Sequence, residues 1–250
     1  VNNFDPTNTS KYYRYTYEET YKVIVPKWSP NKLIINRLDT LQLIPRIGET
    51  RVCFSDNKST NIIITSTNDL VEDRVLNFPI RFIPQSDYII ANRYSILVKQ
   101  YIQNFDSYNF YRILKSFSNS GNVLSQIQPG FIYGNIQCTN NPNEKVIGIF
   151  NVASVSSKRI FFNYEDVFPG QLFPPYLDEC EIFEFTITAF GPSHLTDGFQ
   201  ALKSAIISNR LIYYNHEGDK FRMVIPLCGD CTSFSSNVIP AFWEWKNIKF

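Results

Sequence analysis

Apolar and polar residues alternate along several stretches of the chain, which is the pattern of β-strands with one buried face. In the first stretch, residues 11–25, aromatic and β-branched residues stand between polar ones. We expect a strand there, with Tyr13, Tyr15 and Tyr17 on the same face. Prolines follow, and because proline has no N–H to donate, residues 27–50 are expected to form a long excursion with one short apolar piece.

The middle of the chain contains two candidate strand pairs. Residues 51–54 and 61–65 flank the polar sequence Ser55-Asp56-Asn57, which is typical of a turn, so we expect a short hairpin. Residues 80–83 and 93–103 are joined by another polar link, and the second of these segments is rich in strand-forming residues. We expect these two segments to pair as well.

Helical spacing occurs twice. In residues 106–117, Phe110, Leu114 and Phe117 recur on one helix face, and this stripe is expected to pack in the core. A second helix is expected over residues 197–208, with four apolar residues on one side: Phe199, Leu202, Ile206 and Ile207.

Further strands are expected after residue 130. Three of them would cover residues 130–137, 146–154 and 158–163, and the last two would form a hairpin around Ser156-Ser157. Shorter strands are expected over residues 180–188, 211–214 and 221–225.

The balance of these elements predicts the fold class. Strands outnumber helices, and neither βα alternation nor a repeat of fixed period is present. We therefore expect a single mainly-β domain over residues 1–250, an antiparallel β-sandwich-like domain with one or two short inserted helices. An immunoglobulin-like or fibronectin-like core is one form that such a domain could take.

Composition and charge exclude several classes of protein. The 250 residues carry 24 Lys and Arg against 23 Asp and Glu, so the net charge of +1 gives no basic footprint for nucleic acid. The aromatic content, with 21 Phe, 15 Tyr and 3 Trp, is too high for a disordered chain. No apolar run reaches the length of about 18 residues that a membrane span requires. We expect a folded chain without a nucleic-acid partner.

Candidate catalytic residues are scarce. The only histidines are His194 and His216, and neither lies in a sequence typical of a catalytic triad. Glycine-rich phosphate loops are absent from the sequence. Three pairs of adjacent acids could in principle supply a glycosidase couple, but neighbours on a strand point to opposite faces, so we interpret them as surface charge. These pairs are Glu18-Glu19, Glu165-Asp166 and Asp178-Glu179. No catalytic residue, metal ligand or cofactor is predicted.

The five cysteines include one compact motif, Cys228-Gly229-Asp230-Cys231. A redox motif would require a βαβ context, and a zinc site would require a second pair of cysteines at similar spacing. We favour a structural role, in which one of Cys228 and Cys231 joins Cys180 and the other joins Cys53, leaving Cys138 free. Five reduced thiols in a cytosolic protein are the alternative.

Proline-bounded loops also contain aromatic residues that could form a contact surface. For each ring taken singly, the alternative is that it caps the end of the core. These residues are Trp28, Phe173, Tyr176, Phe242 and Trp243.

A series of motifs resembles a known family. They include RYSILVKQYIQ at 93–103, FYRILK at 110–115, NPNEKVIGIF at 141–150, SVSSKRIF at 154–161, and the ending CGDC followed by NVIPAFW at 228–243. In this order they resemble the Bacteroidota lipoprotein family known as domain of unknown function 4249, over nearly the whole chain.

The resemblance implies a location more than an activity. Members of this family are secreted lipoproteins with an acylated N-terminal cysteine and a preceding immunoglobulin-like domain, so this chain would be the C-terminal portion of a larger protein. It would lie at the outer membrane, on the cell surface, and touch the membrane only through a lipid anchor outside this chain. Neighbouring genes imply a TonB-dependent outer-membrane transporter as partner.

The predicted function is therefore that of a non-enzymatic accessory or ligand-capture subunit of such a transporter. A carboxylate-based hydrolase and a structural or adhesive surface protein are the alternatives.

Overall fold

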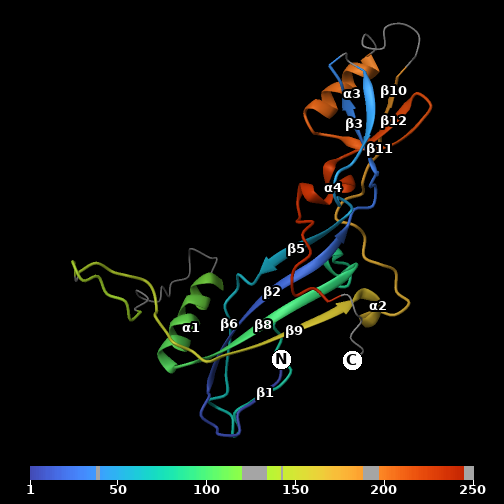
Figure 1. The fold of residues 1–250 in the computed structure, drawn as a ribbon. Coiled ribbons are helices and arrows are strands. Elements are labelled where there is room, and N and C mark those ends of the chain that lie inside the picture. The colour runs from blue at the N-terminus through green and yellow to red at the C-terminus, as the bar shows by residue number, and fades with distance from the viewer. Residues whose placement is uncertain (38–39, 120–133, 142, 188–196, 245–250) are drawn as a thin grey trace. The chain divides into compact units, whose positions relative to one another are not determined.

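The structure, a computed structural model, describes residues 1–37, 40–119, 134–141, 143–187 and 197–244 (Figure 1). The chain divides into two compact units. Unit 1 consists of residues 1–19, 57–83 and 96–160, and unit 2 of residues 20–56, 84–95 and 161–250. The chain is mainly β, consistent with a β-sandwich-like fold, and each strand pair of known register is antiparallel, as the sequence pattern predicted.

The largest sheet has five strands in the order β5-β2-β8-β9, with β6 also paired to β2. Its strands are β2 (Tyr12–Ile24), β5 (Val52–Lys58), β6 (Ile63–Ser66), β8 (Arg93–Gln103) and β9 (Val155–Asn163). Burial alternates along β2, and Tyr13, Tyr15 and Tyr17 all point to its buried face. The predicted strand at residues 11–25 and its inner face are thus confirmed.

The core of unit 1 forms on that buried face of β2. Tyr13, Tyr15 and Val75 are buried together, and Phe78 and Val98 pack against them. Val75 belongs to β7 (Arg74–Val75), which pairs with β1 (Asn3–Phe4).

The opposite face of β2 in unit 1 meets aromatic residues of the helix α1 (Phe105–Asn119). The guanidinium carbon of Arg14 lies 4.3 Å from the ring centroid of Tyr101 and 4.8 Å from that of Tyr111. The first turn of α1 is capped by Asn104, whose Oδ1 accepts a hydrogen bond from Ser107 N at 2.8 Å. The helix predicted over residues 106–117 is thus confirmed.

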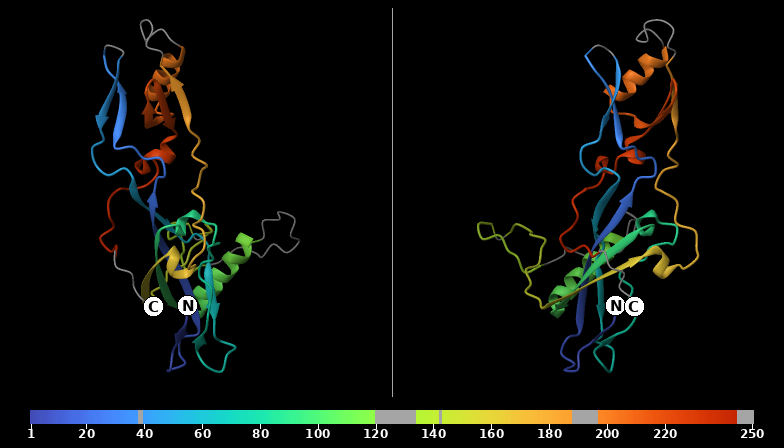
Figure 2. Two further views of the ribbon diagram at one scale, coloured as in Figure 1. Left: turned by 90° about the vertical axis from the view of Figure 1, so that its right-hand side faces the viewer. Right: turned by 45° about the vertical axis from the view of Figure 1, so that its right-hand side comes forward.

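Unit 2 contains a three-stranded sheet, a hairpin and a helix that pack on one another (Figure 2). The buried core that joins them consists of Leu33, Leu202, Tyr213 and Met223. The elements are the hairpin β3 (Asn31–Ile35) and β4 (Leu41–Pro45), the sheet β10 (Phe183–Thr186), β12 (Lys220–Val224) and β11 (Ile212–Glu217), and the helix α3 (Asp197–Ile207).

Four short helical elements complete the described chain. They are the 3-10 turns η1 (Tyr88–Ile90) and η3 (Cys231–Ser233) and the single-turn helices α2 (Tyr164–Val167) and α4 (Pro226–Gly229). No helix in the described residues is both long and apolar enough to span a membrane.

Several expected hairpins are wrong, because long-range pairing replaces local pairing. Residues 55–57 form no turn, since β5 runs straight through them to Lys58. Asp56 and Asn57 instead use their side chains: Asp56 Oδ1 accepts from Thr20 Oγ1 at 2.5 Å, and Asn57 Nδ2 donates to Glu19 Oε1 at 2.8 Å. Both β5 and β6 pair with β2 rather than with each other.

Two more expected strand pairs are wrong. Residues 80–83 form no strand, and the strand at 93–103 pairs with β2 and β9. Ser156-Ser157 is no turn either, because β9 continues through it, and the described residues of 134–154 contain no strand. There the side chain of Asn135 replaces a strand ladder: its Nδ2 donates to Phe150 O, and its Oδ1 accepts from Phe150 N, each at 2.7 Å.

The excursion at residues 27–50 and the second helix also differ in detail from the expectation. The excursion folds as the β3–β4 hairpin, and its short apolar piece supplies the buried Leu33. Helix α3 buries Phe199 and Leu202, but Ile207 is 66% exposed. The physical reason is the period of 3.6 residues, which places Ile207 well off the face that Leu202 occupies.

Candidate functional site

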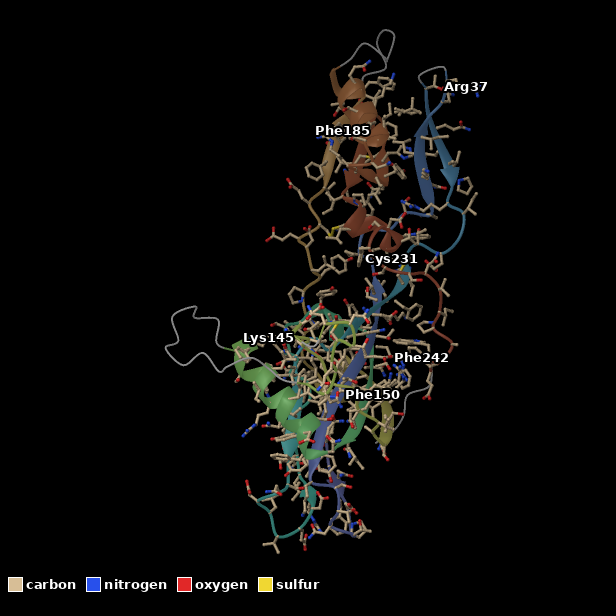
Figure 3. All side chains as sticks on the ribbon, turned by 90° about the vertical axis from the view of Figure 1, so that its left-hand side faces the viewer. Arg37, Lys145, Phe150, Phe185, Cys231 and Phe242 are labelled. Atoms are coloured by element: carbon tan, nitrogen blue, oxygen red, sulfur yellow. A yellow bond between two sulfur atoms is a disulfide. The ribbon has the colours of Figure 1, made fainter. Side chains whose placement is uncertain are left out.

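Two disulfides lie in unit 2, and they realise one of the two pairings that the sequence left open. Cys53 bonds to Cys231 and Cys180 bonds to Cys228, while Cys138 is free. Cys228 lies in α4 and Cys231 begins η3, and Figure 3 labels Cys231. The first disulfide joins β5 to η3 across 178 residues of sequence, and this link builds the candidate site.

The Cys53–Cys231 disulfide holds the segment after η3 against β5. Phe54 N donates to Ser236 O at 2.7 Å, and Ser236 N donates to Phe54 O at 3.2 Å. A hydrogen bond also joins the hydroxyls of Ser55 and Ser235. Residues 231–236 are thereby held against β5 by one covalent bond and three hydrogen bonds.

A groove of about 660 Å³ opens beside this cross-linked segment. Phe54, which is only 3% exposed, lies beneath it, and Phe234 is 37% exposed. Tyr21 and Tyr88 also line it, with their rings edge-to-face at a centroid distance of 5.8 Å and their hydroxyls 3.2 Å apart. Most of the remaining lining residues carry a hydroxyl group, so we call this feature the hydroxyl groove. These residues are Ser55, Asp56, Thr232, Ser233, Ser235 and Ser236.

Few charged side chains line the hydroxyl groove. Among its described lining residues, Asp56 is the one carboxylate, and none is a lysine, an arginine or a histidine. The lining is thus rich in groups that both donate and accept hydrogen bonds, and poor in groups that attract anions.

Asp230, in the middle of the Cys228-x-x-Cys231 motif, holds η3 in place. Its Oδ1 accepts from Thr232 N at 3.0 Å, which caps the turn, and its Oδ2 lies 2.7 Å from Arg46 Nη1. The Arg46 side chain is 8% exposed and that of Asp230 20%, so solvent screens this ion pair less than a surface pair. The motif therefore has a structural role beyond its two sulfur atoms.

A second hollow in unit 2, of about 320 Å³, is lined by residues that include Arg93, Asn163, Tyr164 and Phe173. Arg93 Nε donates to Glu244 O at 2.6 Å and Arg93 Nη1 donates to Asn163 Oδ1 at 3.1 Å. Burial lowers the pKa of the Arg93 guanidinium. These bonds hold Arg93 within the fold, and the other charged residues that line the hollow are Lys22 and Glu165.

The five aromatic residues predicted as contact candidates divide into two groups. Trp28 and Tyr176 pack on the Cys53–Cys231 cluster, where Trp28 Nε1 donates to Thr50 Oγ1 at 2.9 Å and the Tyr176 hydroxyl donates to Leu227 O at 2.8 Å. Burial raises the pKa of Tyr176. Trp243 is buried against Phe54.

The other two contact candidates are exposed, Phe173 at 56% and Phe242 at 41%. Figure 3 labels Phe242. Neither lines the hydroxyl groove. Sequence reasoning missed the groove residues, since Tyr21 and Tyr88 are 67 residues apart. One local signal was available, namely the run Thr232-Ser233-Phe234-Ser235-Ser236 directly after the cysteine motif.

The first acidic pair and His216 make contacts within the fold. Glu18 Oε1 accepts from Lys99 Nζ at 2.7 Å, whereas Glu19 is buried and accepts from Arg81 Nε at 3.2 Å. The two side chains lie on opposite faces of β2, as expected for neighbours on a strand. The His216 ring lies against Phe221. His194 lies outside the described residues.

The remaining acidic pairs have local roles. Asp166 Oδ2 accepts from Asn163 N at 2.8 Å, and Asp178 Oδ1 accepts from Cys180 N at 2.8 Å. Asp178 also lies close to the sulfur atoms of Cys180 and Cys228, an arrangement that three metal ligands could share. Those sulfur atoms are bonded to each other, so neither is a thiolate that could bind a metal ion.

Comparison with known proteins yields one family. A family model described as a domain of unknown function, DUF4249, matches residues 1–159. The hydroxyl groove is lined by residues inside and outside the matched range. Tyr21, Phe54 and Tyr88 lie within the match, and Thr232 to Ser236 lie beyond it. No curated protein and no solved structure matches the chain.

Proposed function

Because the chain belongs to the DUF4249 family, whose function is unknown, we propose a function from its own structure: a non-enzymatic binding module that works outside the cytoplasm. The observation that carries this proposal is the hydroxyl groove, whose lining is held in place by the Cys53–Cys231 disulfide. A pre-formed hollow with convergent polar groups is the usual form of a small-molecule site. A rigid lining also reduces the entropy that binding costs.

The disulfides support a location outside the cytoplasm. Cytosolic thiols are kept reduced in most organisms, whereas disulfides persist in secreted and periplasmic proteins and on cell surfaces. Four of the five cysteines of this chain are paired. We propose that the protein is held at the outer membrane by a lipid anchor, which is the location that the family resemblance implies.

The groove favours binding over hydrolysis. Glycoside hydrolysis in most families requires two carboxyl groups on either side of the bond that is cleaved. Among the described residues that line the groove, Asp56 alone is a carboxylate, and its Oδ1 already accepts a hydrogen bond from Thr20. The described lining of this groove therefore lacks the pair of acids that a carboxylate-based hydrolase would need.

A transporter is the partner that we propose for the module, specifically a TonB-dependent transporter to which it delivers its ligand. Unit 1 offers a surface for such docking in the segment before β9, where Ile147, Phe150 and Val152 are 61%, 72% and 84% exposed. Figure 3 labels Phe150. Exposed apolar residues that are close together are typical of protein interaction sites. A structural or adhesive role would instead use such residues for self-association.

Co-purification from outer membranes tests this partner. We expect the tagged native protein to retain a β-barrel protein of transporter size, and the double variant Phe150→Asp/Val152→Asp to retain at least tenfold less, because charges would enter an apolar contact. Phe82→Asp is the matched control, since Phe82 is another highly exposed phenylalanine of unit 1. Absence of a barrel partner, or a partner that binds the double variant equally well, contradicts docking. Oligomers of the isolated chain in light scattering would favour adhesion.

A further inference from the structure

We propose that the hydroxyl groove binds a neutral saccharide, which deepens the proposed binding function and depends on it. The inference rests on three features of the lining: its hydroxyl groups, its aromatic rings and its charge. Each feature excludes a different class of ligand.

The hydroxyl groups match a ligand that is itself rich in hydroxyls. Seven lining residues carry one, namely Tyr21, Ser55, Tyr88, Thr232, Ser233, Ser235 and Ser236. A hydroxyl offers one donor and two acceptor positions, so a single internal hydrogen bond leaves it able to bind a ligand. Ser55 and Ser235 bond to each other, and the hydroxyls of Thr232 and Ser233 donate to Asp230, so each of these residues uses only part of its capacity.

The aromatic rings supply apolar surface for the C–H face of a sugar ring. Phe234 is the exposed ring, while Tyr21 and Tyr88 combine an apolar ring with a polar hydroxyl. Tyr88 is also supported from behind, since its ring meets that of Tyr176 edge-to-face at 6.5 Å. The Tyr176 hydroxyl is in turn held by Leu227 O. The ring of Tyr88 is therefore positioned before a ligand arrives.

The charge of the lining disfavours anionic ligands. Phosphate and carboxylate groups are usually bound by arginine or lysine, and neither occurs among the described lining residues. Asp56 would repel an anion instead. Acidic sugars and phosphorylated ligands are thus poor candidates, and neutral sugars are good ones.

The edge of the sheet disfavours an extended peptide. A peptide that adds to a sheet needs an unpaired strand edge. β5 is the terminal strand in the order of its sheet, but Phe54 is already bridged to Ser236 on that side. The groove volume of about 660 Å³ lies within the range of about 300–1,000 Å³ that is usual for small-molecule sites.

Calorimetric titration of the oxidised chain tests this inference. The probes are neutral hexasaccharides of glucose, mannose, xylose and N-acetylglucosamine, with hexagalacturonate as the acidic counterpart and a hexapeptide of serine and glycine. We expect at least one neutral probe to bind, and to bind at least tenfold more tightly than hexagalacturonate.

Variants assign the binding to the groove. Phe234→Ala should raise the Kd of the neutral probe about tenfold through loss of the stacking surface. Phe173→Ala is the matched control, since it removes an exposed phenylalanine of the same unit outside the groove, and it should leave the Kd unchanged. Asp56→Asn removes the carboxylate that repels an anion, so it should reduce the ratio of the Kd for hexagalacturonate to the Kd for the neutral probe. Non-reducing mass spectrometry verifies that each variant keeps both disulfides.

The outcomes separate this inference from the proposed function. If only the peptide or the acidic probe binds, and Phe234→Ala weakens that binding, the assignment of a neutral saccharide is wrong while the binding function stands. If no probe binds, the saccharide is wrong, and a transporter that still co-purifies would leave the docking function in place. A neutral probe whose Kd responds to Phe173→Ala but not to Phe234→Ala overturns the assignment to the hydroxyl groove.

Discussion

Two neighbouring tyrosines in unit 1 show how surroundings change the chemistry of a residue. Tyr13 and Tyr15 are 0% and 1% exposed, on the same face of β2. The Tyr13 hydroxyl lies 2.7 Å from Asp73 Oδ1, whereas the Tyr15 hydroxyl has no hydrogen-bond partner among the described residues. Burial raises the pKa of Tyr15 to about 12, and the nearby carboxylate of Asp73 contributes to the shift.

This shift predicts loss of stability at alkaline pH. An unfolded tyrosine ionises near pH 10, whereas folded Tyr15 stays neutral until about pH 12. Its contribution is fully present below pH 10 and is lost as the pH rises through about 12, by about 2–3 kcal/mol for a shift of this size. Urea unfolding at pH 8 to 12 should therefore show a steeper alkaline decline for the wild type than for Tyr15→Phe. Parallel curves for the two proteins would contradict the prediction.

At the scale of elements, helix α3 shows how one face joins a helix to its sheet. Leu202 is 0% exposed and packs with Met223 of β12 and Leu33 of β3. Ile207, five residues later on the same helix, is 66% exposed. The helix therefore contributes to stability through a narrow stripe rather than through its apolar content as a whole.

Two truncations on this helix test that stripe. Leu202→Ala should lower the free energy of unfolding by about 2–5 kcal/mol, because it removes buried methyl groups and leaves a cavity. Ile207→Ala, the matched control on the exposed side, should change it by less than about 0.5 kcal/mol. Chemical unfolding followed by circular dichroism measures both changes. Equal losses for the two variants would show that the helix packs in another orientation.

At the scale of the whole molecule, the disulfides join distant parts of the sequence. Cys53 and Cys231 are 178 residues apart, and Cys180 and Cys228 are 48 residues apart. In the chain-entropy model, each link stabilises the fold by restricting the unfolded chain, and the longer loop gains more. The hydroxyl groove depends on the longer link, since residues 231–236 meet β5 there.

Thiol chemistry tests this arrangement and the proposed location together. When protein taken from its own cells is denatured and alkylated without reductant, Cys138 alone should be modified, because the other four cysteines are paired. The double variant Cys53→Ala/Cys231→Ala should lose about 2–5 kcal/mol of stability, and the control Cys138→Ala less than about 1 kcal/mol. Five alkylated cysteines in protein taken from its own cells would remove the main support for a location outside the cytoplasm.

The sequence by itself determined the features that depend on local pattern. Alternation over residues 11–25 predicted β2, and helical spacing predicted α1 and α3, because burial of one face imposes a period on neighbouring residues. The strand-forming residues of 93–103 predicted β8. The sequence also indicated that Cys53, Cys180, Cys228 and Cys231 form two disulfides, but only the structure decided that Cys53 bonds to Cys231 and Cys180 to Cys228.

Only the tertiary structure decided which segments meet. The polar run at residues 55–57 resembles a turn, yet it lies in a strand because its side chains bond to β2. The hydroxyl groove brings together Tyr21, Phe54, Tyr88 and the segment after Cys231, which no local pattern connects. Contacts of this kind depend on the closure of long loops and on the burial of side chains from distant segments, and these energies belong to the folded chain as a whole.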